Sequence, residues 1–348
     1  MTSHTGSMYC PTAFSSYEHI VLAHGGGGRA MHRLIDGLFA RVLSCPDLDT
    51  EHDGALLDLA GPIAVTTDAF TVRPLFFPGG DIGRLAVCGT VNDIAMCGAR
   101  PRHLAAAFVL EEGLALSDLE SIVRSMATAA REAGVSVVTG DTKVVERGKG
   151  DGVYITTTGL GTRIVPRRVG PRAVRAGDSV LVSGPVGDHG MAVLSVREGL
   201  EHETPLQSDV APVVHSVAAL LEADIEVRFL RDPTRGGLAS ALCELASASG
   251  LGISLREHDI PIRSQVADAC ELLGLDPLYV ASEGRFLSVV AAADAERALI
   301  VLRQHGCPQA ARIGEILASG PGRVILTNAI GGGRVLDMLS GEQLPRIC

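Results

Sequence analysis

Short apolar segments alternate with segments of helical periodicity along the whole chain. Residues 63–68 and 135–139 have the length and apolar character of strands, whereas residues 119–132 place apolar side chains at helical spacing. The alternation resumes at residue 179, after an Arg- and Pro-rich stretch at 166–177. Alternating strands and helices are typical of α/β folds. We therefore expect an α/β protein whose chain is divided near its middle.

The length of 348 residues suits two domains, at about 100–200 residues per domain. We expect an N-terminal domain at 1–165 and a C-terminal α/β domain at 166–337. Residues 338–348 are predicted to form a flexible tail that ends in Cys348. From Leu339 the tail could span about 30 Å when extended, enough to reach a cleft on its own subunit or a neighbour.

Charge and composition exclude several classes of protein. The net charge of -10 argues against nucleic-acid binding, which needs a clustered basic face. No run approaches the ~18 apolar residues of a membrane helix, and the first 16 residues contain no apolar signal segment. The eight cysteines show no C-x-x-C spacing, which leaves a zinc site unsupported. We expect a soluble cytoplasmic protein.

Three aspartates share one sequence context. Asp68, Asp93 and Asp141 each follow an apolar strand or begin a buried helix. A single aspartate there is usually a cap or turn residue. Three of them could bind Mg²⁺, which prefers oxygen ligands and bridges carboxylates to phosphate oxygens. The pattern favours a magnesium–phosphate site.

Three further features suggest roles at such a site, and each has a simpler alternative. The glycine run at 24–29 precedes a helix and could present N–H groups to an anion, or could be only a flexible turn. Lys143 could contact phosphate, exchange protons, or be a solvated surface residue. Glu283 follows an apolar segment and is a candidate general base, or a helix N-terminal acid. The terminal thiol of Cys348 could be a mobile substrate or part of an inert tail; its position excludes prenylation.

Several longer motifs are more specific. They are Asp68-Ala69-Phe70, Phe76-Phe77-Pro78-Gly79-Gly80-Asp81-Ile82-Gly83, Gly89-Thr90-Val91-Asn92-Asp93, Val138-Thr139-Gly140-Asp141-Thr142-Lys143-Val144-Val145, Ser183-Gly184-Pro185-Val186-Gly187-Asp188-His189-Gly190, Arg231-Asp232-Pro233-Thr234-Arg235-Gly236-Gly237 and Pro345-Arg346-Ile347-Cys348. Taken together, these motifs resemble the HypE family of hydrogenase maturation factors from about residue 20 to the end of the chain.

The resemblance implies a fold and a set of site residues. That family belongs with aminoimidazole ribonucleotide synthetase and selenophosphate synthetase, whose N-terminal domains pair across a homodimer into a β-barrel beside the nucleotide cleft. It implies that ATP and Mg²⁺ are bound. Ser282 and Cys88 stand where that family commonly has asparagine. The implied roles are metal binding by Asp68, Asp93 and Asp141; nucleotide binding by Gly26, Gly27, Arg29, Asp81, Asn92 and Thr142; and catalysis by Cys348, Glu283 and Lys143.

The resemblance also implies a reaction and partners. A carbamoyltransferase, HypF, would load a carbamoyl group onto Cys348, and ATP-dependent dehydration would convert the thiocarboxamide into a thiocyanate. The cyano group would pass to iron on a HypC–HypD complex as a ligand for [NiFe]-hydrogenase. Two other functions stay open: a synthetase or kinase of the same superfamily acting on a free metabolite, and a non-catalytic assembly scaffold.

Overall fold

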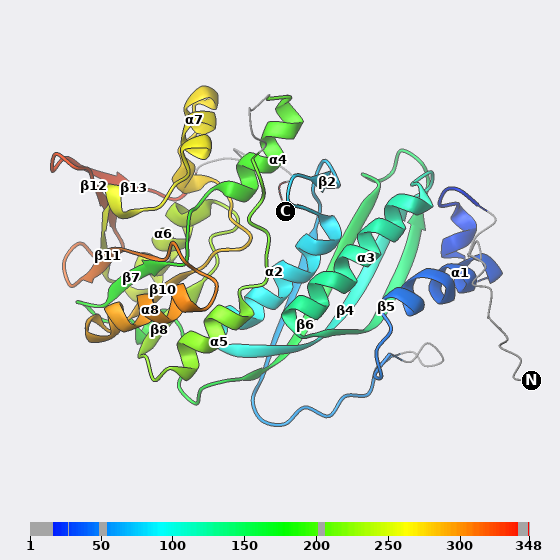
Figure 1. Cartoon of the computed structure of the whole chain (residues 1–348), viewed down its shortest axis with the longest axis horizontal. Coiled ribbons are helices and arrows are strands. Elements are labelled where there is room, and N and C mark those ends of the chain that lie inside the picture. The colour runs from blue at the N-terminus through cyan, green and yellow to red at the C-terminus, as the bar shows by residue number, and fades with distance from the viewer. Residues whose placement is uncertain (1–16, 27, 49–53, 201–205, 340–346, 348) are drawn as a thin grey trace, which may run out of the picture.

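The computed structural model describes residues 17–26, 28–48, 54–200, 206–339 and 347. Gly27 and Cys348, both predicted to be functional, lie outside the described residues. Two larger β-sheets organise the molecule, one in each half of the chain, and lie toward opposite ends of an elongated body (Figure 1).

The N-terminal sheet has four strands in the order β1-β6-β4-β5. β6 pairs antiparallel with β1 and β4, whereas β4 and β5 are parallel. A two-stranded ribbon, β2 with β3, precedes the first long helix. The bounds are β1 Ile63–Phe70, β2 Phe76–Phe77, β3 Gly80–Asp81, β4 Ala99–Glu111, β5 Ser136–Val145 and β6 Val153–Arg163.

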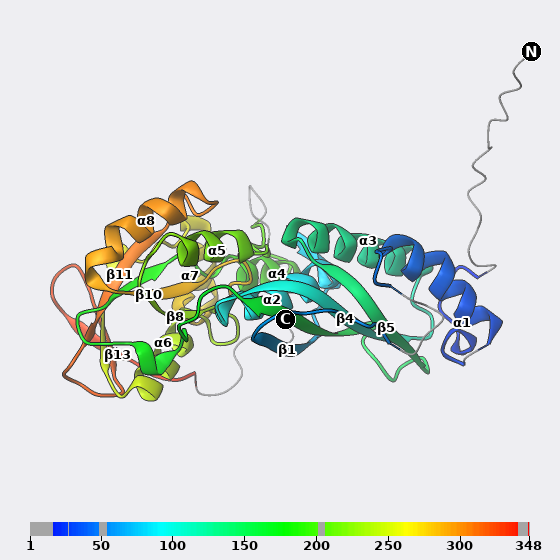
Figure 2. The same cartoon turned by 90° about the horizontal axis from the view of Figure 1, so that it is seen from below.

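Helices cover one face of this sheet. α3 connects the parallel strands β4 and β5, and α1 lies beside β5 (Figure 2). Among the described residues, no helix lies on the opposite face, which we call the open face (Figure 2). The helical bounds are η1 Leu22–Gly25 (3₁₀), α1 Arg29–Leu34, η2 Ile35–Ala40 (π-helical), α2 Ile82–Met96 and α3 Leu116–Ala133.

α2 is the central helix of the molecule. Every residue in it is buried except Arg84 and Asp93. It is capped by Asp81, whose Oδ1 accepts the backbone N–H groups of Gly83 and Arg84 at 2.7 and 3.0 Å. A helix that is apolar around its whole circumference must be enclosed on all sides. Accordingly, α2 packs against the N-terminal sheet, α3 and the C-terminal domain.

The C-terminal sheet has seven strands in the order β13-β12-β9-β11-β7-β10-β8. All neighbours are antiparallel except the β9–β12 pair. Helices α5 and α8 lie on one face and α6 on the other (Figure 2). The strands are β7 Ser179–Val182, β8 Val227–Arg231, β9 Gly252–Arg256, β10 Leu287–Val290, β11 Ala311–Leu317, β12 Val324–Thr327 and β13 Gly333–Leu336. The helices are η3 Pro171–Ala173, α4 Asp188–Glu198, α5 Val214–Glu222, α6 Gly237–Ser249, η4 Glu257–Asp259, α7 Ser264–Leu273, η5 Pro277–Tyr279, η6 Ala292–Asp294 and α8 Ala295–Gln304.

One apolar core extends across the two halves. It joins residues of α2 and α3 to residues of α5, α8 and the C-terminal sheet, including the fully buried Phe286. A second cluster fills the space between α6 and the other face of the C-terminal sheet. The predicted domain boundary at 165/166 falls in the segment between β6 and β7.

The apolar periodicity of the sequence also predicts a helix that begins near Thr90, a strand at 278–281 and a helix at about 209–222, and the structure corrects each of them. The helix expected to begin near Thr90 begins at Ile82, because Asp81 supplies its cap. The segment at 278–281 is not a strand: it begins in η5, and Glu283 lies in the loop before β10. The helix expected from residue 209 begins at Val214, and the residues before it form a loop.

Candidate active site between the two domains

Four carboxylates line a small pocket where the two domains meet. Asp68 comes from β1 and Asp93 from α2, whereas Asp232 follows β8 and Glu283 precedes β10. The other lining residues are Ala69, Phe70, Gly89, Thr234 and Arg235. The structure therefore brings Asp68, Asp93 and Glu283 together, as the sequence predicted for one site, and adds Asp232.

The two N-terminal carboxylates of the pocket have few internal partners. Thr66 donates its hydroxyl to Oδ2 of Asp93 at 2.8 Å, and the Ala69 backbone N–H donates to Oδ1 of Asp68 at 2.8 Å. The Arg235 guanidinium lies 4.0 Å from Asp68. Burial raises the pKa of Asp93, and the nearby Asp68 adds to that rise.

The two C-terminal carboxylates are more deeply buried. Burial, and next the charge of Asp93, raise the pKa of Asp232 to about 7. Burial and then Asp232 raise the pKa of Glu283 well above its ordinary value. Oε1 of Glu283 is buried without a hydrogen-bond partner among the described residues. A buried polar atom in this state is poised to meet a proton, a cation or a ligand.

Asp141 and Lys143 lie elsewhere. Both side chains are more than half exposed, and Lys143 Nζ is 3.2 Å from Asp141 Oδ2. Across the sheet, Asp141 pairs with Ala107, Ala107 with Thr156, and Thr156 with Ala69. Three strand spacings place Asp141 roughly 14 Å from the β1 backbone. Since side chains alternate between faces, Asp141 shares the open face with Ala69, whereas Asp68 points to the other.

The predicted metal triad is therefore not assembled within one chain. Asp68 and Asp93 meet at the domain interface, and Asp141 lies apart on the open face. Within the described ranges, no group of three or more His, Cys, Asp or Glu side chains is arranged to hold a metal ion. The sequence could not reveal this, because spacing along the chain does not report which face of a sheet a residue occupies.

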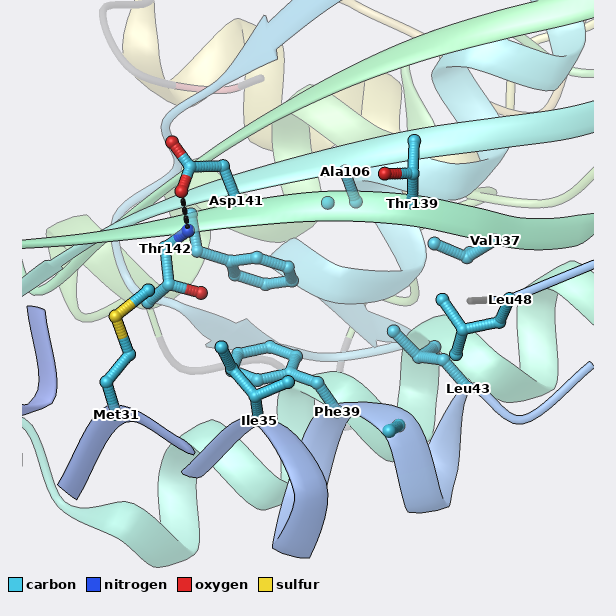
Figure 3. A pocket seen from close by; sticks show the side chains of 13 residues that line it. Met31, Ile35, Phe39, Leu43, Leu48, Ala106, Val137, Thr139, Asp141 and Thr142 are labelled. Atoms are coloured by element: carbon cyan, nitrogen blue, oxygen red, sulfur yellow. Dashed lines mark hydrogen bonds between the residues drawn. The ribbon is translucent and has the colours of Figure 1, made fainter. Parts of the chain in front are cut away.

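A second, larger pocket lies beside the edge strand β5. Met31, Ile35, Phe39 and Leu43 form an apolar wall below the strand, and Asp141 and Thr139 point upward, away from that wall (Figure 3). Thr142 is buried at one end of the pocket, and its backbone N–H donates to Asp141 Oδ1 at 2.8 Å.

The glycine run lies against the same strand. A Cβ on Gly25 would be 2.8 Å from the backbone nitrogen of Val144, so only glycine allows this approach. Gly26 ends η1, and Arg29 begins α1. Gly26, Arg29, Thr142 and Lys143 are therefore neighbours along one edge of the N-terminal sheet.

Asp81 and Asn92 occupy structural positions. Asp81 caps α2, as described above. Asn92 is fully buried, and its side chain makes three hydrogen bonds to backbone groups of the C-terminal domain. Asn92 therefore offers no accessible side-chain surface to a nucleotide, whereas Asp81 is half-buried and uses Oδ1 for the cap.

Ile347, the residue before the terminal cysteine, is anchored to α4, a contact that sequence analysis did not predict. Ile347 is 4 % exposed and belongs to the main core. Its carbonyl oxygen accepts a hydrogen bond from His189 Nε2 at 2.9 Å. Ser208 donates to His189 Nδ1 at 2.8 Å in that tautomer. Burial lowers the pKa of His189 to about 4, so the ring is neutral near pH 7. The backbone N–H of Gly190 bonds to Ala281 O, two residues before Glu283.

Two substitutions noted in the sequence have clear structural settings. Ser282 Oγ accepts the backbone N–H of Gly187 at 2.8 Å, so its hydroxyl joins two loops. Cys88 is fully buried in α2, and burial raises its pKa to about 12, which keeps the thiol protonated. All six described cysteines are free. Among the described residues, no helix is long and apolar enough to cross a membrane.

Comparison with known families agrees with this two-part architecture. Residues 51–163 match the N-terminal domain of AIR synthase related proteins, and residues 175–327 match the C-terminal domain of the same family. The chain thus belongs to the AIR synthase-related class of two-domain α/β proteins.

Individual relatives narrow this assignment. Carbamoyl dehydratase HypE of Azotobacter vinelandii is 54% identical over 333 residues, covering 94% of this chain and 97% of that protein. A crystal structure of hydrogenase maturation protein HypE in complex with ATP superposes with a TM-score of 0.91 at 49% identity, covering 94% of this chain and 99% of that one. A HypE chain from a HypE–HypF complex superposes with a TM-score of 0.78 at 46% identity, covering 88% and 99%. Within the AIR synthase-related class, the chain belongs to the HypE family.

Proposed function

We propose that this protein is an ATP-dependent carbamoyl dehydratase that acts on its own C-terminal Cys348 during [NiFe]-hydrogenase maturation. The proposal rests on the position of Ile347, whose carbonyl is bound by His189 beside the Glu283 loop. The residue before the terminal cysteine is thus bound to α4, and the next residue of that helix, Gly190, is hydrogen-bonded to the segment that leads to Glu283. The similarity to proteins known as carbamoyl dehydratase HypE supports the same activity.

The reaction needs an activated oxygen and a base. The carbonyl oxygen of a thiocarboxamide is a poor leaving group, and transfer of the ATP γ-phosphoryl group to it makes phosphate the leaving group. Loss of the two N–H protons and departure of phosphate then form the C≡N bond, giving thiocyanate, ADP and phosphate. Glu283 is the base we assign to the nitrogen, because it is buried and has an unpartnered oxygen.

Asp68 and Asp93 are the residues we assign to Mg²⁺ in one chain. Their carboxylates are hard oxygen ligands, and both line the interdomain pocket with few internal partners. When bound, Mg²⁺ would neutralise phosphate charge that these carboxylates otherwise repel. We assign the nucleotide to the edge of the N-terminal sheet where Gly26, Arg29, Thr142 and Lys143 lie. We assign Gly27 to the same role from the sequence alone.

A homodimer would complete the site. The open face carries the exposed apolar side chains of Ile63 and Val65, at 48% and 61% exposure. It also carries Asp141 and Lys143. Pairing of two open faces would bury this apolar surface and form the barrel expected for the superfamily. It would also bring Asp141 and Lys143 of one copy toward the carboxylate pocket of the other, which supplies the groups that a single chain keeps apart.

Two partner systems follow from this function. HypF is the donor of the carbamoyl group, in keeping with the HypE–HypF complex among the relatives. The HypC–HypD complex is the acceptor of the cyano group, and we place the cycle in the cytoplasm.

Intact-protein mass spectrometry tests the proposal directly. After incubation with HypF, carbamoyl phosphate and ATP, one carboxamide should appear on Cys348, and fresh Mg-ATP should then remove one water. Cys348→Ala should bind ATP and remain folded but take up no carboxamide. Absence of an adduct on the wild type would favour a synthetase acting on a free metabolite. An adduct that never loses water would favour a carrier or scaffold without dehydratase activity.

A further inference from the structure

Glu283 lies in a loop, yet its backbone is held on both sides. The residues around it form neither helix nor strand, so its N–H and C=O groups receive no partners from regular structure. Two buried side chains supply them. We propose that Asn92 and Asp209 form a clamp that fixes the position of the Glu283 carboxylate, and that both are positioning residues for the dehydration step.

The two bonds of the clamp come from different domains. Asp209 Oδ1 accepts the Glu283 backbone N–H at 3.0 Å. Asn92 Nδ2, on α2 of the N-terminal domain, donates to the Glu283 carbonyl oxygen at 3.0 Å. Side chains thus satisfy both the backbone N–H and the backbone C=O of Glu283. These two bonds hold the φ and ψ angles of Glu283 more tightly than an unsupported loop would.

Asn92 also fastens the loop that contains Asp209. Its Nδ2 donates to Ala211 O at 3.0 Å, and its Oδ1 accepts the Val213 N–H at 2.8 Å. With the bond to Glu283, the fully buried amide of Asn92 joins α2 to two loops, the one at 211–213 and the one that contains Glu283. A buried amide with all three partners in place is a rigid element, because loss of any partner leaves an unsatisfied polar group.

The loop that contains Asp209 also packs directly against the residue after Glu283. A Cβ on Gly284 would lie 1.8 Å from the Asp209 carbonyl oxygen, so the two backbones are in direct contact. Asp209 is itself held by Arg285, whose Nε is 3.6 Å from Asp209 Oδ2. The Glu283 backbone is therefore held by Asn92, by Asp209 and by close packing.

The clamp links the two halves of the pocket. Asn92 is adjacent in sequence to Asp93, whose side chain faces the pocket. One turn of α2 thus places the Asp93 carboxylate in the pocket and, through Asn92, binds the backbone of Glu283. Since catalytic groups must be placed to within a fraction of an ångström, a displacement of about 1 Å can lower the rate by on the order of 100-fold.

This inference rests on the proposed dehydratase function, and the experiment separates the two. The carbamoylated protein is prepared first, and loss of water is then followed in a single turnover at saturating Mg-ATP. Asp209→Ala removes the acceptor for the Glu283 N–H, whereas Asp209→Asn keeps an acceptor oxygen. Asn92→Ala removes the donor to the Glu283 carbonyl. Asn328→Ala, which removes a loop-stabilising amide from the β12–β13 hairpin, is the matched control.

We expect Asp209→Ala and Asn92→Ala to slow dehydration by roughly 10–100-fold, with ATP affinity and the extent of carbamoylation close to wild type. Asp209→Asn should recover most of the rate, and Asn328→Ala should be unchanged. The rescue by asparagine separates positioning from a general loss of stability. If one alanine variant does not fold, the other tests the clamp from the opposite domain, and Asp209→Asn tests the role of the acceptor.

Three outcomes would overturn the clamp. One is a wild-type dehydration rate in both alanine variants while the wild-type protein itself is active. Another is a loss of ATP affinity in Asn92→Ala with a normal rate at saturating ATP, which would make Asn92 a nucleotide-binding residue as the sequence predicted. The third is a rate in Asp209→Asn as low as in Asp209→Ala. A wild-type protein that never loses water would instead refute the proposed function.

Discussion

Carboxylate side chains occur in two opposite environments in this protein: the buried interdomain pocket and the exposed open face of the N-terminal sheet. Asp232 and Glu283 are buried in the interdomain pocket, whereas Asp141 and Lys143 are exposed on the open face of the N-terminal sheet. In the pocket, burial and mutual repulsion raise carboxyl pKa values; Asp232 reaches about 7. On the open face, water screens the Asp141–Lys143 pair. Burial thus prepares the first region for proton transfer, and exposure leaves the second available to a nucleotide or a partner copy.

The largest expected effect tests whether the chemistry belongs to the buried region. Glu283→Gln keeps the shape of the side chain but removes the base, so dehydration should fall by on the order of 10²–10⁴-fold while carbamoylation and ATP binding persist. Mass spectrometry of the carbamoylated variant measures this. Glu315→Gln, a substitution at an exposed glutamate, is the control. Normal turnover of Glu283→Gln would remove Glu283 as the base.

The pH dependence of stability should separate the two regions. Because the folded state binds the Asp232 proton more tightly than the unfolded chain does, the free energy of unfolding should decrease as pH rises from about 4 to about 7. Asp232→Asn should remove this decrease in the free energy of unfolding, because asparagine has no proton to release. The variant should be about 1–3 kcal/mol more stable than wild type at pH 8 and nearly equal to it at pH 4.

Urea unfolding at the two pH values provides the measurement. Asp141→Asn is the exposed counterpart and should show no such pH-dependent gain. Equal behaviour of Asp232→Asn and Asp141→Asn would mean that burial does not distinguish the two regions.

The open face can be tested by disrupting its apolar surface. Val65→Arg should convert a dimer to a monomer, because it places a charge where the two faces would pair. ATP affinity should then fall by about tenfold, since Asp141 and Lys143 of the partner copy no longer reach the pocket. Light scattering and titration with nucleotide measure both effects. Ile330→Arg, at a 92% exposed residue of the β12–β13 hairpin, should change neither. A monomeric wild-type protein that binds ATP normally would contradict the shared site.

The smallest effect concerns the exposed ion pair. Lys143→Gln should change the free energy of unfolding by less than about 0.5 kcal/mol, because a solvated pair contributes little to stability. Thermal unfolding of the variant measures this. A loss of more than about 1 kcal/mol would show that the pair is more structural than its exposure indicates.

The sequence predicted much of this molecule for physical reasons that are local. The alternation of apolar strands and amphipathic helices indicated two α/β halves, and the two sheets confirm it. The same pattern placed Asp68 and Asp93 beside apolar elements, where the structure has them. Asp232 was given no role because the sequence does not show that the end of β8 meets Asp68 and Asp93 of the other domain. The separation of Asp141 from Asp68 was missed because strand order and side-chain alternation, not distance along the chain, decide which residues meet.

The anchoring of Ile347 has a kinetic consequence. An enzyme whose substrate is attached to its own last residue meets that substrate at a local concentration set by the covalent connection and not by the amount of protein in solution. When a chain serves its own site, dehydration is then a first-order process whose rate does not change on dilution, as long as the functional assembly stays intact. Only loading of the carbamoyl group and delivery of the cyano group require a collision with another protein. Any dependence of the whole cycle on protein concentration should therefore come from its partner encounters and not from the dehydration step.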